Sequence, residues 1–299
     1  AAGTGTAALE APVWTSETKC AAMVNHPTLS TAGSSLGGTQ MNKELGLIDI
    51  LASLSLLLPV IGFSVWAGLR LERSIITAAL RAAVQLLAVG LLFRFIFEAE
   101  FALTLTSLWV AAMVVIAGVV IQRRAPGLPG LRWMGILAIG LATTVTVGII
   151  IGLQILPLEP ISLLVVAGIS IGNALPSSVL AAQLTRRYFQ ERTNEVEAML
   201  ALGLTTSHIR RIAVADIAQV ALVQQIERTR MVGLIAIPGT MTGLLLAGVD
   251  PVQAVLMQLV VMYLVLGSTA LGVIVITVVG SRGAFTPDWR PAAWTQLRA

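Results

Sequence analysis

The chain has 299 residues, of which 56% are hydrophobic and only 11% are charged, and its formal net charge is +4. Soluble domains carry about 25% charged residues, so this composition excludes a water-exposed globular protein and predicts an integral membrane protein. The single cysteine, Cys20, excludes a disulfide framework and a thiolate metal cluster.

Residues 1–40 are rich in Ala, Gly, Ser and Thr and show no periodic apolar face. They also lack the continuous apolar stretch of a signal peptide. We expect a disordered leader or one added for expression, with an organelle transit segment as the alternative. A new composition begins at Met41, and residues 41–299 are predicted to form a single transmembrane domain.

Seven apolar runs are near the ~20 residues that a helix needs to cross a bilayer. Because backbone exposed to lipid must satisfy its own hydrogen bonds, these runs are predicted to be helices. Pro59, near the middle of the first run, is expected to kink it. The predicted fold is therefore an all-α polytopic membrane protein. Its seven expected spans are residues 48–69, 74–97, 101–121, 133–155, 161–184, 231–249 and 252–279.

The charges between the spans alternate in sign. Arginine follows the first, third, fifth and seventh spans, whereas the other connections carry Glu98 and Glu100, Glu159, and Asp250. The positive-inside rule then places the N-terminus outside and the C-terminus in the cytoplasm, with Lys43 as a mild exception. Since the same rule accounts for the net positive charge, nucleic acid is not an expected partner.

The longest polar interruption is residues 186–230, which we interpret as the main cytoplasmic loop. At its centre, Glu197 precedes Gly203 by about one and a half helical turns, and glycine suits the left-handed position that ends helices. A short helix of this kind could dock into a cleft of another protein, although an ordinary solvated helix is the alternative. Residues 212–226 are too short and too polar to cross alone, and we expect an interfacial helix there.

Four motifs carry a family resemblance. They are Arg81-Ala82-x-x-Gln85-Leu86, Gly172-Asn173-Ala174, the stretch from Glu197-Ala198 to Leu202-Gly203, and the block from Met231 through Pro238-Gly239-Thr240-Met241 to Pro251. Together they resemble FetB-type iron-export ABC transporter permeases, a family that includes plant aluminium-tolerance permeases. The resemblance covers about residues 47–280. The chain has Gln224, Arg230 and Thr240 where family members often have Pro, Lys and Met, and the last difference removes one soft sulfur.

The resemblance implies the membrane-spanning permease subunit of an ABC exporter, in a bacterial inner membrane, with two copies pairing with two ATPase subunits. Its cargo would be iron or another metal or metal-linked solute. Glu197, Ala198, Leu202 and Gly203 would couple the chain to the ATPase. The sequence has no Walker A motif, so ATP and Mg²⁺ are expected on the partner and no cofactor on this chain.

The Pro238-Gly239 pair marks a candidate translocation path. A break inside a membrane helix frees backbone carbonyls, and transporters build ion sites at such breaks. Thr240 and Met241 adjoin this break, and Gly172, Asn173 and Pro176 form a similar weak point in the fifth span. If the two breaks face each other, the Asn173 amide oxygen and the Met241 sulfur could line one path for a metal. The same glycines also suit close helix packing, and this alternative stays open.

Two further sets of polar residues are candidates. Arg81 and Gln85 share one helix face, about 10 Å into the second span, where Arg81 could line the path or reach back to the surface. Glu159 and Asp250 could receive a cation at the outer face, or could be solvated turn residues. Without Cys or His in the spans, a metal would pass on weak oxygen and thioether ligands.

The alternative function is a self-contained secondary transporter or channel for a cation. It requires an intramembrane acid or histidine relay, and the second to seventh spans offer no candidate. A membrane enzyme lacks any paired carboxylate or Ser/His set within the spans. The sequence does not define the cargo.

Overall fold

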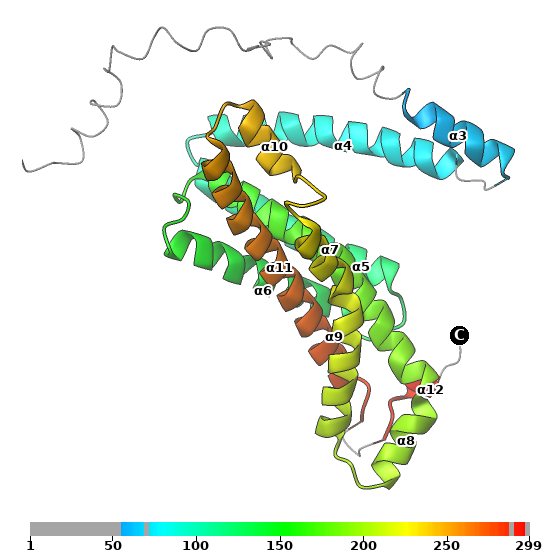
Figure 1. Ribbon diagram of the computed structural model, residues 1–299. Helices are drawn as coiled ribbons and strands as arrows, with labels where there is room; N and C mark the ends of the chain where they lie inside the picture. The colour runs from blue at the N-terminus through cyan, green and yellow to red at the C-terminus, as the bar shows by residue number, and fades with distance from the viewer. Residues whose placement is uncertain (1–54, 69–71, 287–289, 297–299) are drawn as a thin grey trace, which may run out of the picture. The chain divides into compact units, whose positions relative to one another are not determined.

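The computed structural model describes residues 55–68, 72–286 and 290–296, and in them the regular structure is helical apart from two isolated bridges. Five of the described helices are long and apolar enough to cross a membrane (Figure 1). This confirms the all-α, multi-pass fold class. The five are α4 (Glu72–Glu98), α5 (Ala102–Arg124), α6 (Leu131–Gly152), α7 (Pro160–Glu191) and α11 (Pro251–Arg282).

The first expected span is described only in part. Helix α3 (Leu57–Trp66) falls within it, while residues 48–54 and the expected leader lie outside the described residues. Pro59 is the third residue of α3, where backbone N–H groups have no partner within the helix. The expected kink of the span at Pro59 stays a prediction, because residues 48–54 lie outside the described residues.

The chain divides into two compact units, Ala1–Ala83 and Val84–Ala299. In the first unit, the Ser64 hydroxyl donates to the Glu72 carboxylate across 3.3 Å and links α3 to the start of α4. In the second unit, α5, α6, α7 and α11 pack on one another around a shared apolar core. That core includes Ile121, Ile139 and Ile276, which are fully buried.

Helices α7 and α11 lie in close parallel contact through small residues. A Cβ atom placed on Gly272 would lie 2.8 Å from the Ser178 hydroxyl oxygen, and one on Gly280 would lie 3.2 Å from Thr185 Cγ2. Both pairs advance in the same direction along the two helices. Small residues allow such close backbone approach, which membrane helices use in place of hydrophobic burial.

The expected cytoplasmic loop, residues 186–230, is largely helical. It contains the end of α7, then α8 (Thr193–Ala201), then α9 (Thr206–Met231). Helix α9 packs against α7 and α11, with a buried stripe at every fourth residue. The stripe consists of Ala213, Ile217, Ala221 and Gln225. Residues 212–226 are helical, as expected, and this stripe attaches α9 to the bundle, while their interfacial position stays a prediction.

The sixth expected span is not one helix. Helix α9 ends at Met231, residues 232–238 form an irregular segment, and α10 covers Gly239–Leu246. Gly233 adopts φ +87°, a left-handed conformation that only glycine takes easily. The chain then turns into α11, and its final short helix, α12, is Ala293–Gln296.

Helix α5 approaches α6 most closely at Gly118. A Cβ atom there would overlap the Ile136 side chain and lie 2.9 Å from the Ile136 backbone nitrogen. We expect Gly118→Ala to lower the free energy of unfolding by about 1–3 kcal/mol, because the backbone must move apart. Thermal unfolding of the purified chain in detergent measures this.

Gly148→Ala, on the facing helix α6, is the matched control, because nothing lies within 4 Å of a Cβ atom placed on that residue. It should leave the melting temperature unchanged or raise it slightly, since alanine favours helix by up to ~1 kcal/mol over glycine. Equal effects of the two substitutions would contradict the close contact.

Candidate functional site

Helix α8 ends in the way that the Glu-Ala-x-x-x-x-Gly spacing predicts. Gly203 has φ +86°, and its N–H donates to the Leu200 carbonyl across 3.0 Å. The N–H of Leu204 donates to the Met199 carbonyl across 3.1 Å. These two bonds form a Schellman motif, and Leu204 and Met199 both pack on the same apolar cluster, as that motif requires. The left-handed C-cap at Gly203 is confirmed.

The two sides of α8 differ in burial. Val196 is buried against Phe189 of α7 and Ile209 of α9. On the other side Glu197, Ala198, Leu202 and Gly203 are all exposed, and Leu202 is 81% exposed. The four residues expected to couple to an ATPase therefore lie together on one outward surface, which we call the α8 face.

The C-terminal residues 283–286 and 290–296 fold back over the junction between α7 and α8. The Gln190 amide donates to the Trp294 carbonyl across 3.2 Å. The Thr193 hydroxyl donates to the Phe189 carbonyl across 2.8 Å, one turn earlier, and its oxygen also lies 3.2 Å from the Thr295 carbonyl oxygen. The Trp294 indole N–H donates to the Gly283 carbonyl across 2.8 Å. Gln190 and Thr193 lie on either side of the helix break at Arg192, so this segment, the C-terminal clasp, fixes the angle of α8.

An aromatic cluster supports the clasp. The Phe189 ring lies edge-on to Phe285 at 5.8 Å and to Trp294 at 6.4 Å between ring centres. Arg192 lies over the Tyr188 ring at 4.9 Å and within 3.7 Å of Asp216 on α9. Since Arg192 and Asp216 are about half exposed, their ion pair contributes little, and aromatic packing carries most of the stabilisation. The clasp was not among the sequence predictions; its signal was aromatic residues beyond the last span.

The polar end of α7 also anchors the α5–α6 connection. Arg186 donates to the Pro126 carbonyl across 2.7 Å, and Gln183 donates to the Arg124 carbonyl across 2.8 Å. Gly127 takes φ +114°, and a Cβ atom there would touch the Arg186 side chain at 3.0 Å. These bonds bring the basic ends of α5 and α7 to the same level.

The Pro-Gly block forms a loop-to-helix transition. Pro238 is the N-cap residue of α10, and its carbonyl accepts from Thr242 N–H across 3.0 Å. The Thr240 hydroxyl donates to the Gln258 side-chain oxygen on α11. Gln258 is 5% exposed and was not among the predicted site residues, although it is an amide within an apolar run. This bond ties α10 to α11.

The expected weak point in α7 is not a break. Helix α7 continues through Pro176 as 32 uninterrupted residues. The Asn173 amide donates to the Ile169 carbonyl across 2.9 Å, and proline leaves the Gly172 carbonyl without its helical N–H partner. The interpretation of residues 172–176 as a discontinuity is therefore wrong, while Gly172 is exposed and Asn173 is half-buried.

A cavity of about 330 Å³ lies where α10 meets α6, α7 and α11. Thr240 and Ile169 both line it, so the break before α10 faces the α7 turn that Asn173 contacts. Met241 and Asn173 are not among its lining residues, and the proposed oxygen–sulfur pair stays a prediction. The remaining lining is apolar except for Gln258.

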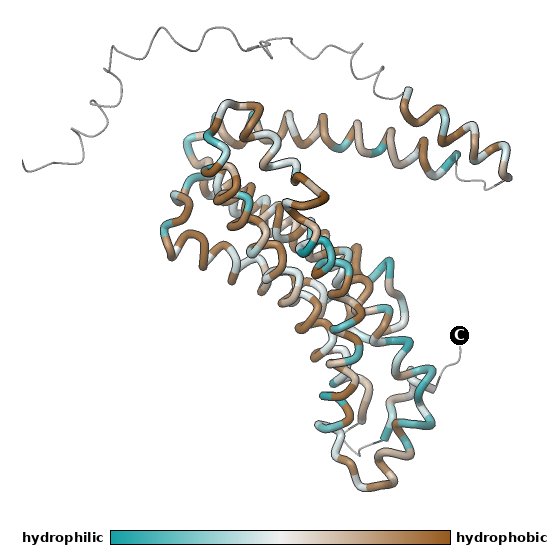
Figure 2. The backbone as a smooth tube through the Cα atoms, viewed as in Figure 1, coloured by the Kyte–Doolittle hydropathy of each residue, from teal (hydrophilic) through white to brown (hydrophobic). Residues whose placement is uncertain are grey.

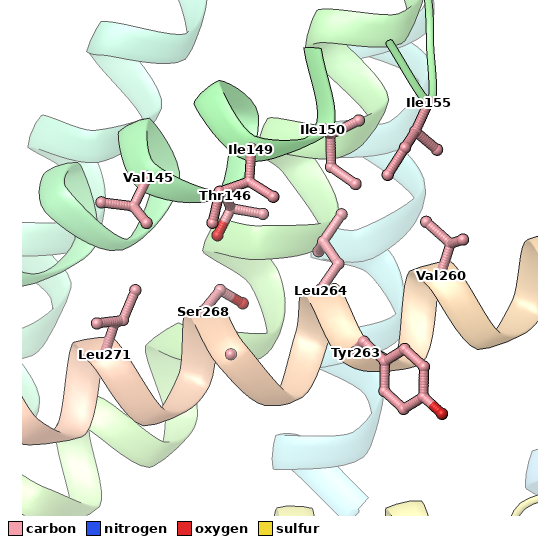
Figure 3. Close-up of a pocket in the computed structure, with 11 residues that line it drawn as sticks. Val145, Thr146, Ile149, Ile150, Ile155, Val260, Tyr263, Leu264, Ser268 and Leu271 are labelled. Atoms are coloured by element: carbon pink, nitrogen blue, oxygen red, sulfur yellow. The ribbon is translucent and has the colours of Figure 1, made fainter. Parts of the chain in front are cut away.

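A neighbouring cavity of about 240 Å³ lies between α6 and α11 (Figure 3). Two of its three hydroxyls bond within their own helices: Thr146 donates to the Ala142 carbonyl and Ser268 to the Val265 carbonyl. The other labelled side chains are apolar apart from the Tyr263 hydroxyl. This cavity therefore offers no ligand set for a metal.

The structure gives each of the remaining predicted site residues a separate position. Asp250 caps α11 by accepting from Val252 N–H across 3.0 Å and Gln253 N–H across 3.2 Å, while Glu159 is the N-cap residue of α7 without a side-chain bond. Arg81 and Gln85 are exposed on α4. Within the described residues, no group of three or more His, Cys, Asp or Glu could hold a metal ion.

Apolar helices of spanning length, joined by arginine-rich ends, define a multi-pass α-helical membrane protein. The chain belongs to the uncharacterised protein family UPF0014, whose sequence model matches residues 47–285. No solved structure matches the chain.

Curated relatives extend over most of the chain. The membrane protein YjkA of Bacillus subtilis is 30% identical over 72% of this chain and 86% of its own length. ALUMINUM SENSITIVE 3 of Arabidopsis thaliana is 29% identical over 78% of this chain and 85% of its length. The "probable iron export permease protein FetB" of Escherichia coli is 29% identical over 69% of this chain and 80% of its length. The family resemblance predicted from the four motifs is confirmed.

Substitution of Trp294 tests whether the C-terminal clasp holds the α7–α8 junction. We expect Trp294→Ala to lower the free energy of unfolding by about 2–3 kcal/mol, because a half-buried ring and its hydrogen bond are lost. The α7–α8 junction should open locally, so limited trypsin digestion should cut faster after Arg187 and Arg192. Trp133→Ala, at a 70% exposed position on α6, is the control and should change stability by no more than ~0.5 kcal/mol. Unchanged cleavage in Trp294→Ala would contradict the clasp.

Proposed function

We propose that this chain is the membrane-spanning permease subunit of an ABC transporter, driven by a separate ATPase and exporting iron or a related metal or solute. The observation that carries the proposal is the α8 face: Glu197, Ala198 and Leu202 are exposed together on a helix with a fixed end and a braced base. An exposed apolar residue beside a carboxylate suits docking into a cleft of another protein. The name of the FetB relative supports the transport class.

Force on α8 would reach the membrane through two helices. Helix α8 is joined to α7 at Arg192 and to α9 at Thr205, and its inner side is packed between them through Val196. The clasp prevents α8 from hinging freely at Arg192. A push on the α8 face would therefore move α7 and α9 together, as rigid bodies do in alternating access.

The assembly that follows is a homodimer of the permease with two ATPases in a bacterial inner membrane. The chain crosses seven times, with its N-terminus outside and its C-terminus in the cytoplasm. The sixth crossing is discontinuous, formed by α9, residues 232–238 and α10. ATP and Mg²⁺ bind the partner, and this chain holds no cofactor of its own.

The cargo would pass on weak ligands. Thr240, Met241 and the carbonyls freed around Pro238 adjoin the break in the sixth crossing, and Asn173 lies one turn from the cavity that Thr240 lines. Oxygen and thioether donors bind transition metals loosely enough for release. A panel of metal ions tested for stimulation of the assembled ATPase would identify the cargo.

Charge reversal on the α8 face tests the coupling. We expect Glu197→Arg to weaken binding of the co-expressed ATPase at least about tenfold, because loss of an interfacial charge contact costs more than ~1.4 kcal/mol. The measurement is co-purification from membranes together with ATPase activity. Glu191→Arg, an exposed charge reversal at the end of α7, is the control and should retain the partner.

The alternative, a self-contained secondary transporter or channel, makes the opposite prediction. The purified chain would then move cations across liposomes without any ATPase, and Glu197→Arg would leave that flux unchanged. Either result would overturn the ABC proposal.

A further inference from the structure

The depth of α9 in the bundle follows from two contacts. At its start, Arg210 and Arg211 line a pocket of about 260 Å³ with Ser281 and Arg282 at the end of α11. Beyond the other end of α9, Thr240 at the start of α10 contacts Gln258 on α11. Helices α9 and α11 are therefore antiparallel, and the basic pocket marks the level at which α11 leaves its apolar stretch.

The charged end of α9 lies far from that boundary. From Arg210 to Arg228 the helix rises about 27 Å at 1.5 Å per residue, whereas the 32 residues of α11 span about 48 Å. Arg228 is thus beyond the midpoint of α11 and still short of the Thr240–Gln258 contact. Figure 2 shows this end of α9 as a hydrophilic stretch beside apolar segments.

Most of the exposed side chains at this depth are polar, with Val223 as an exposed apolar residue among them. Glu227 and Arg230 form an ion pair at 2.6 Å with 51% and 70% of their side-chain surfaces exposed. Gln224 and Arg228 are also exposed, whereas Gln225 on the opposite side is buried. Arginine in the last turn favours the negative end of the helix dipole, but this does not account for Glu227 or Gln224.

Hydrocarbon is an unsuitable surrounding for this surface. A charged side chain at the centre of a bilayer raises the free energy by about 2.5–3.5 kcal/mol or more, and such residues almost always face a protein interior or a water-filled cavity. Irregular backbone at membrane depth is likewise tolerated only where protein or water covers it. Residues 232–238, directly after these charges, are irregular, with Leu234 91% exposed.

We propose that the polar side of α9 formed by Gln224, Glu227, Arg228 and Arg230 lines a water-filled transport path that ends at the break before α10. This deepens the proposed function, since the path then serves a hydrated or chelated solute. A bare soft ion would instead require a chain of sulfur ligands.

Cysteine accessibility tests the path. The chain has a single native cysteine, so Cys20→Ser gives a cysteine-free background. Gln224→Cys and Arg228→Cys are the test variants, and labelling with a membrane-impermeant cationic methanethiosulfonate is measured in sealed vesicles of both orientations. The thiolate is the reactive form and requires water, so we expect both positions to react at least ~10-fold faster than a lipid-facing thiol.

Two control variants give the labelling rates of a lipid-facing thiol and of a buried thiol. Leu141→Cys places a thiol on the exposed apolar side of α6, and Ala221→Cys places one in the buried stripe of α9. Labelling of Gln224→Cys and Arg228→Cys at the rate of these controls, in chains that elute as folded protein, would overturn the path. Either test variant alone suffices if the other does not fold.

The outcome separates this inference from the coupling proposal. Water access along α9 does not require an ATPase, so fast labelling with an ineffective Glu197→Arg would retain the path and reject the coupling. Slow labelling with an effective Glu197→Arg would do the reverse.

Discussion

The close parallel contact between α7 and α11 is the constraint on which the arrangement of the second unit depends. Gly272 and Gly280 allow Ser178 and Thr185 to approach the α11 backbone, which fixes the register of the two helices. That register sets Arg282 level with the basic end of α7, and Arg186 and Gln183 then hold the α5–α6 connection at the same level. One packed contact thus collects the arginines at one boundary of the apolar region, as orientation by positive charge requires.

From that boundary the chain extends an arm whose joints are held by hydrogen bonds and apolar contacts. Helix α7 continues beyond its apolar part to Glu191, α8 is braced by the clasp, and α9 returns against both. Leu202, directly before the helix-ending glycine, is a large apolar side chain that this arm leaves exposed. An apolar surface on a rigid arm suits a partner better than it suits water.

Local signals in the sequence were sufficient to predict the end of α8 and the positions of the long apolar helices. Gly203 is predictable because the left-handed C-cap is a property of a few adjacent residues. The clasp was not predictable, since its bonds join residues 102 and 104 positions apart. The packing of α9 on the bundle was not predicted, because its glutamines and charges concealed a stripe of Ala213, Ile217 and Ala221 that is buried against neighbouring helices. Orientation, dimerisation and the path residues stay predictions, because they depend on a bilayer and on a second chain.

Pro176 and Pro238, the two prolines of the expected path, differ in their surroundings, and this difference indicates which segment would deform if α8 were pushed. Pro176 leaves a single carbonyl, that of Gly172, without its helical partner, yet α7 stays continuous and can transmit a push along its length. Pro238 instead stands outside a helix, as the N-cap of α10, at the end of an irregular segment whose own backbone hydrogen bonds lie within residues 231–236. Since α10 is tied to α11 through Thr240 and Gln258, a displacement of α9 would be taken up in residues 232–238. The segment that deforms is then the one next to the charged end of α9, so a push on α8 would alter the path where its polar groups are gathered.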